Sequence, residues 1–194
     1  MIDYFADQQF ELAIREGKSL EVIEEVYSGK SVIGIISISN LNAHYFERHF
    51  TSKNLAFTSL ATVKQHVFLR KEHPLAHCKT LHFEQLKTYP YLSYQQEDTL
   101  LHFAEERLHV DDIQQLIYVT DRGTMNNLLA NTNGYNIGTG CIVPGYMNPN
   151  IISIPLHEEQ LLQIGFIRRH DAPLTEELLV YLDFMKKALN NSLP

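Results

Sequence analysis

Hydroxyls, amides and an arginine stand in this sequence where predicted strands end or lead into predicted helices. A helix start exposes unpaired backbone N–H groups and carries the positive end of the helix dipole, so such turns suit a small polar or anionic ligand. The side chains placed to contact one are Ser19, Ser37, Ser39, Gln95, Gln96, Thr99, Arg122 and Thr124. The pattern indicates ligand binding.

Each candidate also has an ordinary structural interpretation. Ser19 and Thr124 are suited to capping the helices that follow them, and serines such as Ser37 and Ser39 commonly end strands. Arg122 offers a planar guanidinium for two hydrogen bonds to a carboxylate, but it is equally compatible with a solvated surface position. Both interpretations stay open at this point.

Features that resemble metal or catalytic sites are weak. Pro74 interrupts the one dense group of metal-binding residue types, which consists of His73, His77, Cys78 and His82. Gly138–Gly140 lacks the following residues of a phosphate loop, and Cys141 has no basic neighbour in sequence. We therefore predict no enzyme activity, no metal and no cofactor.

Composition excludes several classes of protein. The 194 residues are 44% hydrophobic, which is enough for a buried core, and no apolar run is long enough to cross a membrane. The net charge of −7 and the dispersed Lys and Arg residues argue against nucleic-acid binding by this chain. Two cysteines outside any CxxC pair favour reduced thiols, and we predict a cytoplasmic protein.

Hydrophobic periodicity predicts an α/β fold. Phe10–Arg15 alternates like a strand, Ser19–Ser28 has helical spacing and Val32–Ile38 is a β-branched run, which together predict a right-handed βαβ unit in a parallel sheet. Further strands are expected at Gln65–Arg70, Pro90–Tyr94, Leu116–Thr120 and Gln163–Arg168, and helices at Thr99–Leu108, Thr124–Asn131 and Thr175–Leu189.

The order of several weak landmarks resembles the effector-binding domain of LysR-type transcriptional regulators. They are Phe10–Gly17 with its helix, the segment Val67–Ala76 containing His-Pro-Leu, Leu86 followed by Tyr89–Leu92, and Ile164–Arg169 leading through Pro173-Leu174-Thr175 into the last helix. The resemblance implies a two-lobed, periplasmic-binding-protein type II-like fold with two crossover strands and an effector in the cleft between the lobes. Lobe I would comprise residues 1–63 and 164–194, and lobe II residues 64–163.

The sequence also departs from this family. Only Met1–Gln9 precede the segment matching Phe10–Gly17, so the resemblance implies that lobe I is incomplete at its N-terminus and that the helix-turn-helix DNA-binding domain is absent. Where the family commonly has Gly-x-Gly-Ile, this chain has Gly134-Tyr135-Asn136-Ile137, and Asn can adopt the left-handed backbone that Gly would supply.

The resemblance implies an effector-sensing domain that binds a small metabolite, with an anion as one option, and that forms a homodimer or homotetramer through Ser19–Ser28 and Thr124–Asn131. DNA would be contacted only through the absent domain. The alternative is a solute-binding protein of a transport system, which would need a signal peptide or lipid anchor. An enzyme on the same scaffold is a third option, and it would require an acid, base or nucleophile in the cleft.

Overall fold

The computed structural model describes residue 4 and residues 11–95, 113–158 and 160–192. The helices are α1 (Ser19–Tyr27), α2 (Ala43–Ser52), α3 (Phe83–Leu86), α4 (Arg122–Asn131) and α5 (Glu176–Ser192). The strands are β1 (Gly34–Ser39), β2 (Leu55–Lys64), β3 (His66–Arg70), β4 (Tyr91–Tyr94), β5 (Leu116–Val119), β6 (Asn136–Gly138), β7 (Ile151–Pro155) and β8 (Leu161–Arg169). None of the helices in these ranges is both long and apolar enough to span a membrane.

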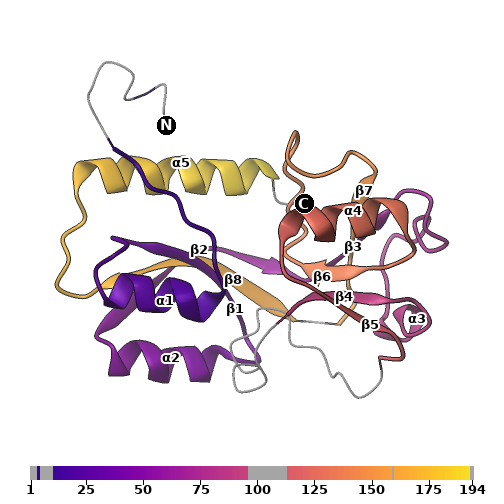
Figure 1. The fold of residues 1–194 in the computed structure, drawn as a ribbon, viewed down its shortest axis with the longest axis horizontal. Coiled ribbons are helices and arrows are strands. Elements are labelled where there is room, and N and C mark those ends of the chain that lie inside the picture. The colour runs from indigo at the N-terminus through magenta and orange to yellow at the C-terminus, as the bar shows by residue number, and fades with distance from the viewer. Residues whose placement is uncertain (1–3, 5–10, 96–112, 159, 193–194) are drawn as a thin grey trace.

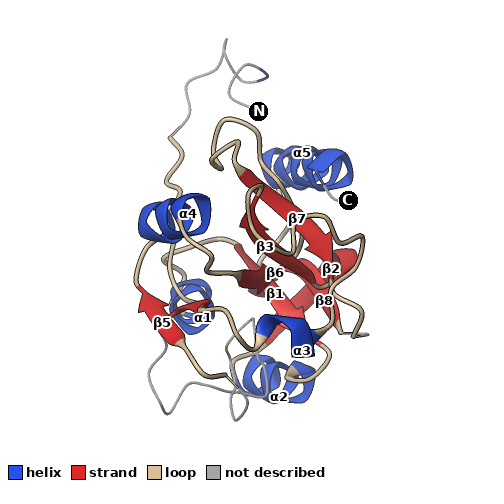
Figure 2. Ribbon diagram, turned by 90° about the vertical axis from the view of Figure 1, so that its right-hand side faces the viewer, coloured by secondary structure: helices blue, strands red, loops and turns tan. Residues whose placement is uncertain are grey.

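One sheet has the order β1-β8-β2, and both outer strands run antiparallel to β8. Helices α1 and α2 cover one face of this sheet and α5 lies over the other (Figures 1 and 2). The core on the α1 and α2 side contains apolar residues from both helices and from β1, including Ile23, Phe46 and Ile36. β8 is therefore the central strand of this sheet, with helices on both of its faces, and β1 is an edge strand.

The other sheets are β6-β3-β7 and the parallel pair β4-β5. They lie beside α3 and α4 at the opposite end of the molecule (Figure 1). Two core clusters hold them together, one around Leu69 and Tyr135 and the other around Leu92 and Leu129. The second group thus has its own buried apolar interior.

The chain passes between the two groups within extended backbone. Gln65 alone separates β2 from β3, and its N–H donates to the carbonyl of Gln160, just before β8, at 3.1 Å. The β2–β8 ladder therefore continues to the point where both strands leave the first sheet. A pair of short extended connections between two α/β units is the arrangement of the type II periplasmic-binding-protein-like fold, and it confirms the predicted fold class.

Most predicted elements are confirmed with shifts of one to three residues at their ends. The helix predicted at Ser19–Ser28 is α1, that at Thr124–Asn131 is α4, and the long closing helix is α5. The predicted strands correspond to β1, β3, β4, β5 and β8. The helix predicted at Thr99–Leu108 lies outside the described residues.

The predicted βαβ unit is wrong. Residues 11–18 form no strand, and β1 pairs with β8 in the antiparallel direction. Alternation of apolar and polar residues gives a segment the side-chain pattern of a strand, but a strand also needs a neighbouring backbone for its hydrogen bonds. No described strand pairs with residues 11–17, so this segment has no ladder hydrogen bonds to a described strand.

Candidate functional site

The start of α4 is fixed by Asp121. One carboxylate oxygen of Asp121 accepts the N–H of Thr124 at 2.8 Å, and the other accepts its hydroxyl at 2.7 Å. The backbone bond from Thr124, followed by the hydroxyl bond, lowers the pKa of Asp121. The prediction that Thr124 caps this helix is therefore wrong, since Asp121 is the cap and Thr124 is its donor.

Arg122, next to this cap, is bonded to a distant carboxylate. Its Nε donates to Glu16, which lies in the exposed segment before α1. Burial of the guanidinium acts to lower the pKa of Arg122, but the hydrogen bond and charge of Glu16 outweigh it and the pKa is raised. The structure thus joins the N-terminal segment to the second group of elements through an ion pair that no local sequence pattern predicts.

The three serine candidates lie in the first group of elements and are nearly buried. Ser19 is the first residue of α1, and Lys18 occupies the N-cap position, so the prediction that Ser19 caps the helix is wrong. Ser39 accepts the N–H of Leu41 at 3.2 Å. Ser37 is 8% exposed, and its hydroxyl has no hydrogen-bond partner among the described residues. Of the three, Ser37 is the one whose hydroxyl the described residues leave available.

Gln95 follows β4 and is exposed. Its N–H donates to the carbonyl of Val119 at 2.8 Å, which extends the β4–β5 pairing by one residue and leaves the side-chain amide in solvent reach. Gln96 and Thr99 lie outside the described residues. The structure therefore places Gln95, Arg122 and Thr124 in the second group of elements and the three serines in the first.

Gln65 is a polar residue that sequence reasoning missed as a site candidate. It is 0% exposed, and neither its amide nitrogen nor its amide oxygen has a partner among the described residues. Its backbone is fully used, because the N–H donates to Gln160 and the carbonyl accepts from Leu156 at 3.0 Å. A buried amide with no bonds is costly, so this side chain is a candidate for contact with a bound molecule.

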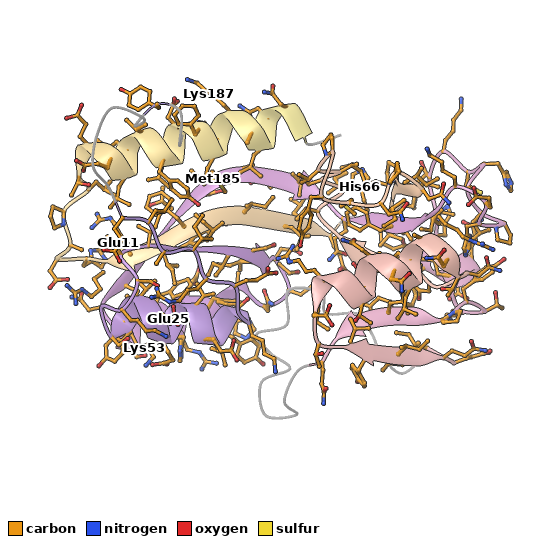
Figure 3. The ribbon with its side chains drawn as sticks, turned by 45° about the horizontal axis from the view of Figure 1, so that its top comes forward. Glu11, Glu25, Lys53, His66, Met185 and Lys187 are labelled. Atoms are coloured by element: carbon orange, nitrogen blue, oxygen red, sulfur yellow. The ribbon has the colours of Figure 1, made fainter. Side chains whose placement is uncertain are left out.

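A cavity of about 740 Å³ lies within the first group of elements. The segment Glu11–Gly17, the edge of β1, and residues of α1 and α5 line it. Figure 3 shows Glu11, Glu25 and Met185, which come from three of these elements. None of the described candidate residues lines this cavity, so the candidates predicted from the sequence do not point to it.

His73 has a structural role. It is 3% exposed, its Nδ1 accepts the N–H of Leu75 at 3.1 Å, and its Nε2 lies 3.1 Å from the carbonyl of Asn133. Burial, opposed by the bond to Asn133, lowers the pKa of His73, so the neutral ring is favoured. The ring anchors the turn after β3 to the loop after α4.

We expect His73 to make the protein less stable in mild acid. The pKa of His73 is lower in the folded state than in the unfolded state, so the neutral ring stabilises the fold fully above the unfolded pKa, near 6.5. This stabilisation is lost as the pH falls from there through the folded pKa, at up to about 1.4 kcal/mol of unfolding free energy per pH unit. Urea unfolding at several pH values between neutral and mildly acidic measures this effect. The free energy of unfolding should fall less steeply with decreasing pH in His73→Gln than in the original protein.

The exposed residue His77 provides the control. His77→Gln should keep the full dependence of the unfolding free energy on pH. His73→Gln should keep part of it, because burial also lowers the pKa of His49, which both variants retain. Equal slopes for His73→Gln and the original protein would contradict the assignment.

The two α/β units and their extended connections define a class of ligand-binding domains with the type II periplasmic-binding-protein-like fold. The LysR substrate binding domain family model matches residues 6–190, and the chain belongs to this family. It is an effector-sensing regulatory domain, and nothing supports the transport alternative. No match was found among curated proteins.

Several solved structures share this fold. The reduced form of OxyR has a TM-score of 0.62 and 15% identity, covering 93% of this chain and 82% of that one. The effector binding domain of QuiR in complex with shikimate has a TM-score of 0.61 and 16% identity, covering 91% and 78%. HinK, a LysR family transcriptional regulator from Pseudomonas aeruginosa, has a TM-score of 0.60 and 13% identity, covering 90% of this chain and 58% of that one.

Proposed function

We propose that this domain binds a small polar or anionic metabolite between its two α/β units, in contact with Gln65. The observation that carries the proposal is the fully buried amide of Gln65 at the connection between the units, which has no hydrogen-bond partner among the residues that the structure describes. A ligand that hydrogen-bonds this amide would remove the cost of leaving it unpaired. QuiR, which shares the fold, was solved with the carboxylic acid shikimate.

The predicted candidates divide between the two walls of this proposed site. Lobe I, residues 1–63 and 164–194, would contribute Ser19, Ser37 and Ser39, and lobe II, residues 64–163, would contribute Gln95, Gln96, Thr99, Arg122 and Thr124. For Arg122 to bind a ligand carboxylate, it would exchange Glu16 for that carboxylate. Effector binding would thereby release the N-terminal segment from α4.

The output would be regulation of transcription by a cytoplasmic protein. Closure of the lobes around the effector would alter how paired domains place an attached DNA-binding domain. The pairing would form a homodimer or homotetramer and use α1 and α4, the helices that the family resemblance assigns to it. The net charge of −7 supports leaving DNA contact to another part of the protein.

A thermal-shift screen of cellular metabolites, including shikimate and other organic acids, tests the proposal. A ligand present at a hundredfold its dissociation constant should raise the free energy of unfolding by about 2.7 kcal/mol. The hit should lose most of its effect in Arg122→Ala if the effector is an anion. A panel in which no metabolite produces a saturable shift would contradict effector binding by these residues.

A further inference from the structure

The amide of Gln65 has a second glutamine opposite it. The last pair of the β2–β8 ladder is Lys64 with Leu161, and both residues are exposed. Gln65 and Gln160 continue this pairing, because the N–H of Gln65 donates to the carbonyl of Gln160. Paired residues share a face and successive residues alternate between faces. The two glutamine side chains therefore lie together, on the face opposite to Lys64 and Leu161.

These two side chains carry three polar atoms that form no hydrogen bond with any described residue. They are the amide nitrogen and the amide oxygen of Gln65 and the amide oxygen of Gln160. All three atoms are buried, although Gln160 as a residue is partly exposed. Buried polar atoms without bonds are costly, and here each of the two extended connections contributes at least one. A ligand bonded to both side chains would remove this cost on both connections.

The kind of atom left without a bond indicates what such a ligand must provide. An amide nitrogen donates two hydrogens, whereas an amide oxygen only accepts. The set thus has two acceptors, on Gln65 and Gln160, and one donor group, on Gln65. A carboxylate also only accepts, so by itself it would bond the nitrogen of Gln65 and leave both oxygens unpaired. An amide NH₂ or an ammonium group has enough hydrogens for both oxygens.

We propose that the effector is an amino acid, or a compound with the same grouping, whose nitrogen donates to the amide oxygens of Gln65 and Gln160 and whose neighbouring oxygen accepts from Gln65. The inference rests on the proposed function, which places the effector at Gln65, and it narrows the chemical class of that effector. An amino acid fits because its ammonium group and carboxylate are neighbours, as are the oxygen and nitrogen of the Gln65 amide.

The probes are the common amino acids, followed by the 2-hydroxy acid and the unsubstituted acid that carry the side chain of the best binder. The ammonium group can donate to both glutamine oxygens, the hydroxyl to one and the unsubstituted acid to neither. Titration calorimetry should rank the affinities in that order, with at least about a tenfold loss from the amino acid to the unsubstituted acid. Equal affinities, or no binding by any amino acid, would overturn the inference.

Variants at Gln160 test the role of its amide oxygen. Gln160→Glu keeps an acceptor and adds a negative charge, so it should bind the amino acid more tightly and the unsubstituted acid more weakly. Gln163→Glu adds the same charge at an exposed position on the other face of β8, and as the control it should change neither affinity. Weaker binding of the amino acid by Gln160→Glu would overturn the inference.

Gln160→Met removes the amide and should weaken amino-acid binding without lowering the free energy of unfolding, measured in urea. A loss of stability would show that this oxygen is bonded within the protein, which would also overturn the inference. The thermal-shift screen separates failure of the inference from failure of the proposed function. A saturable hit that depends on Gln65 but carries no N–H group would overturn the inference alone, whereas a screen without a saturable hit would overturn both.

Discussion

Gly165→Ala is expected to lower the free energy of unfolding by about 3 kcal/mol or more, the upper end of what overpacking costs. A Cβ at this position would lie 2.4 Å from the carbonyl oxygen of Thr58 and 2.5 Å from the ring of Phe57. Gly165 is in β8, opposite Ile36 on one side and Ser59 on the other. A shift of β8 away from Thr58 would therefore strain its bonds to β1.

Urea unfolding monitored by circular dichroism measures this effect. Gly123→Ala is the matched control, because Gly123 lies in α4 and a Cβ there meets only the Asp121 carboxylate, at 3.2 Å. Alanine favours the helix over glycine, so that variant should stay within about 1 kcal/mol of the original protein. A Gly165→Ala protein as stable as the Gly123→Ala protein would show that β2 and β8 separate more easily than the register implies.

The elements that could be predicted are those whose signals are local. α5 begins directly after Thr175, whose hydroxyl accepts the N–H of Leu178 at 3.5 Å, and its apolar spacing continues to Leu189. α1 ends just before Gly29, which has a φ of +76°. Helical spacing and terminal residues carry this information within a few turns of chain, so distant neighbours were not needed.

Strand pairing was not predictable to the same extent. The apolar run of β1 was correctly read as a strand buried on both faces, but its partner β8 is more than a hundred residues further along the chain and antiparallel. β2 was missed because its burial does not alternate regularly and a bulge lies between Ser59 and Ala61. Period-two patterns identify faces, whereas the choice of partner depends on the whole chain.

The same distinction applies to the site. The sequence places Thr124 at a helix start and suits it to capping, whereas in the structure Asp121 is the cap and Thr124 is its donor. Arg122 and Glu16 are 106 residues apart in sequence, and no local pattern links them. Gln65 resembled an ordinary strand residue, since only the packed structure shows that its amide is buried and has no partner in the described part of the chain.

Gln65→Met is expected to stabilise the free protein and weaken effector binding at the same time. Methionine has nearly the same length and shape but lacks the two amide atoms, so the variant avoids the cost of burying them and should gain about 1–2 kcal/mol in the free energy of unfolding. A merely structural amide would give a loss of stability instead. The sign of the change therefore distinguishes an unsatisfied amide from one held by internal bonds.

Binding provides the second half of this prediction. If the effector bonds the amide of Gln65, methionine should weaken its affinity by at least about tenfold, or 1.4 kcal/mol, measured by titration calorimetry with the best hit of the screen. Gln163→Met, at an exposed position of β8, is the control and should change neither the free energy of unfolding nor the affinity for the effector. A stabilised Gln65→Met protein with unchanged affinity would place the effector elsewhere. An amide that destabilises the free protein and gains hydrogen bonds only from a ligand is what we expect of a residue that serves ligand recognition.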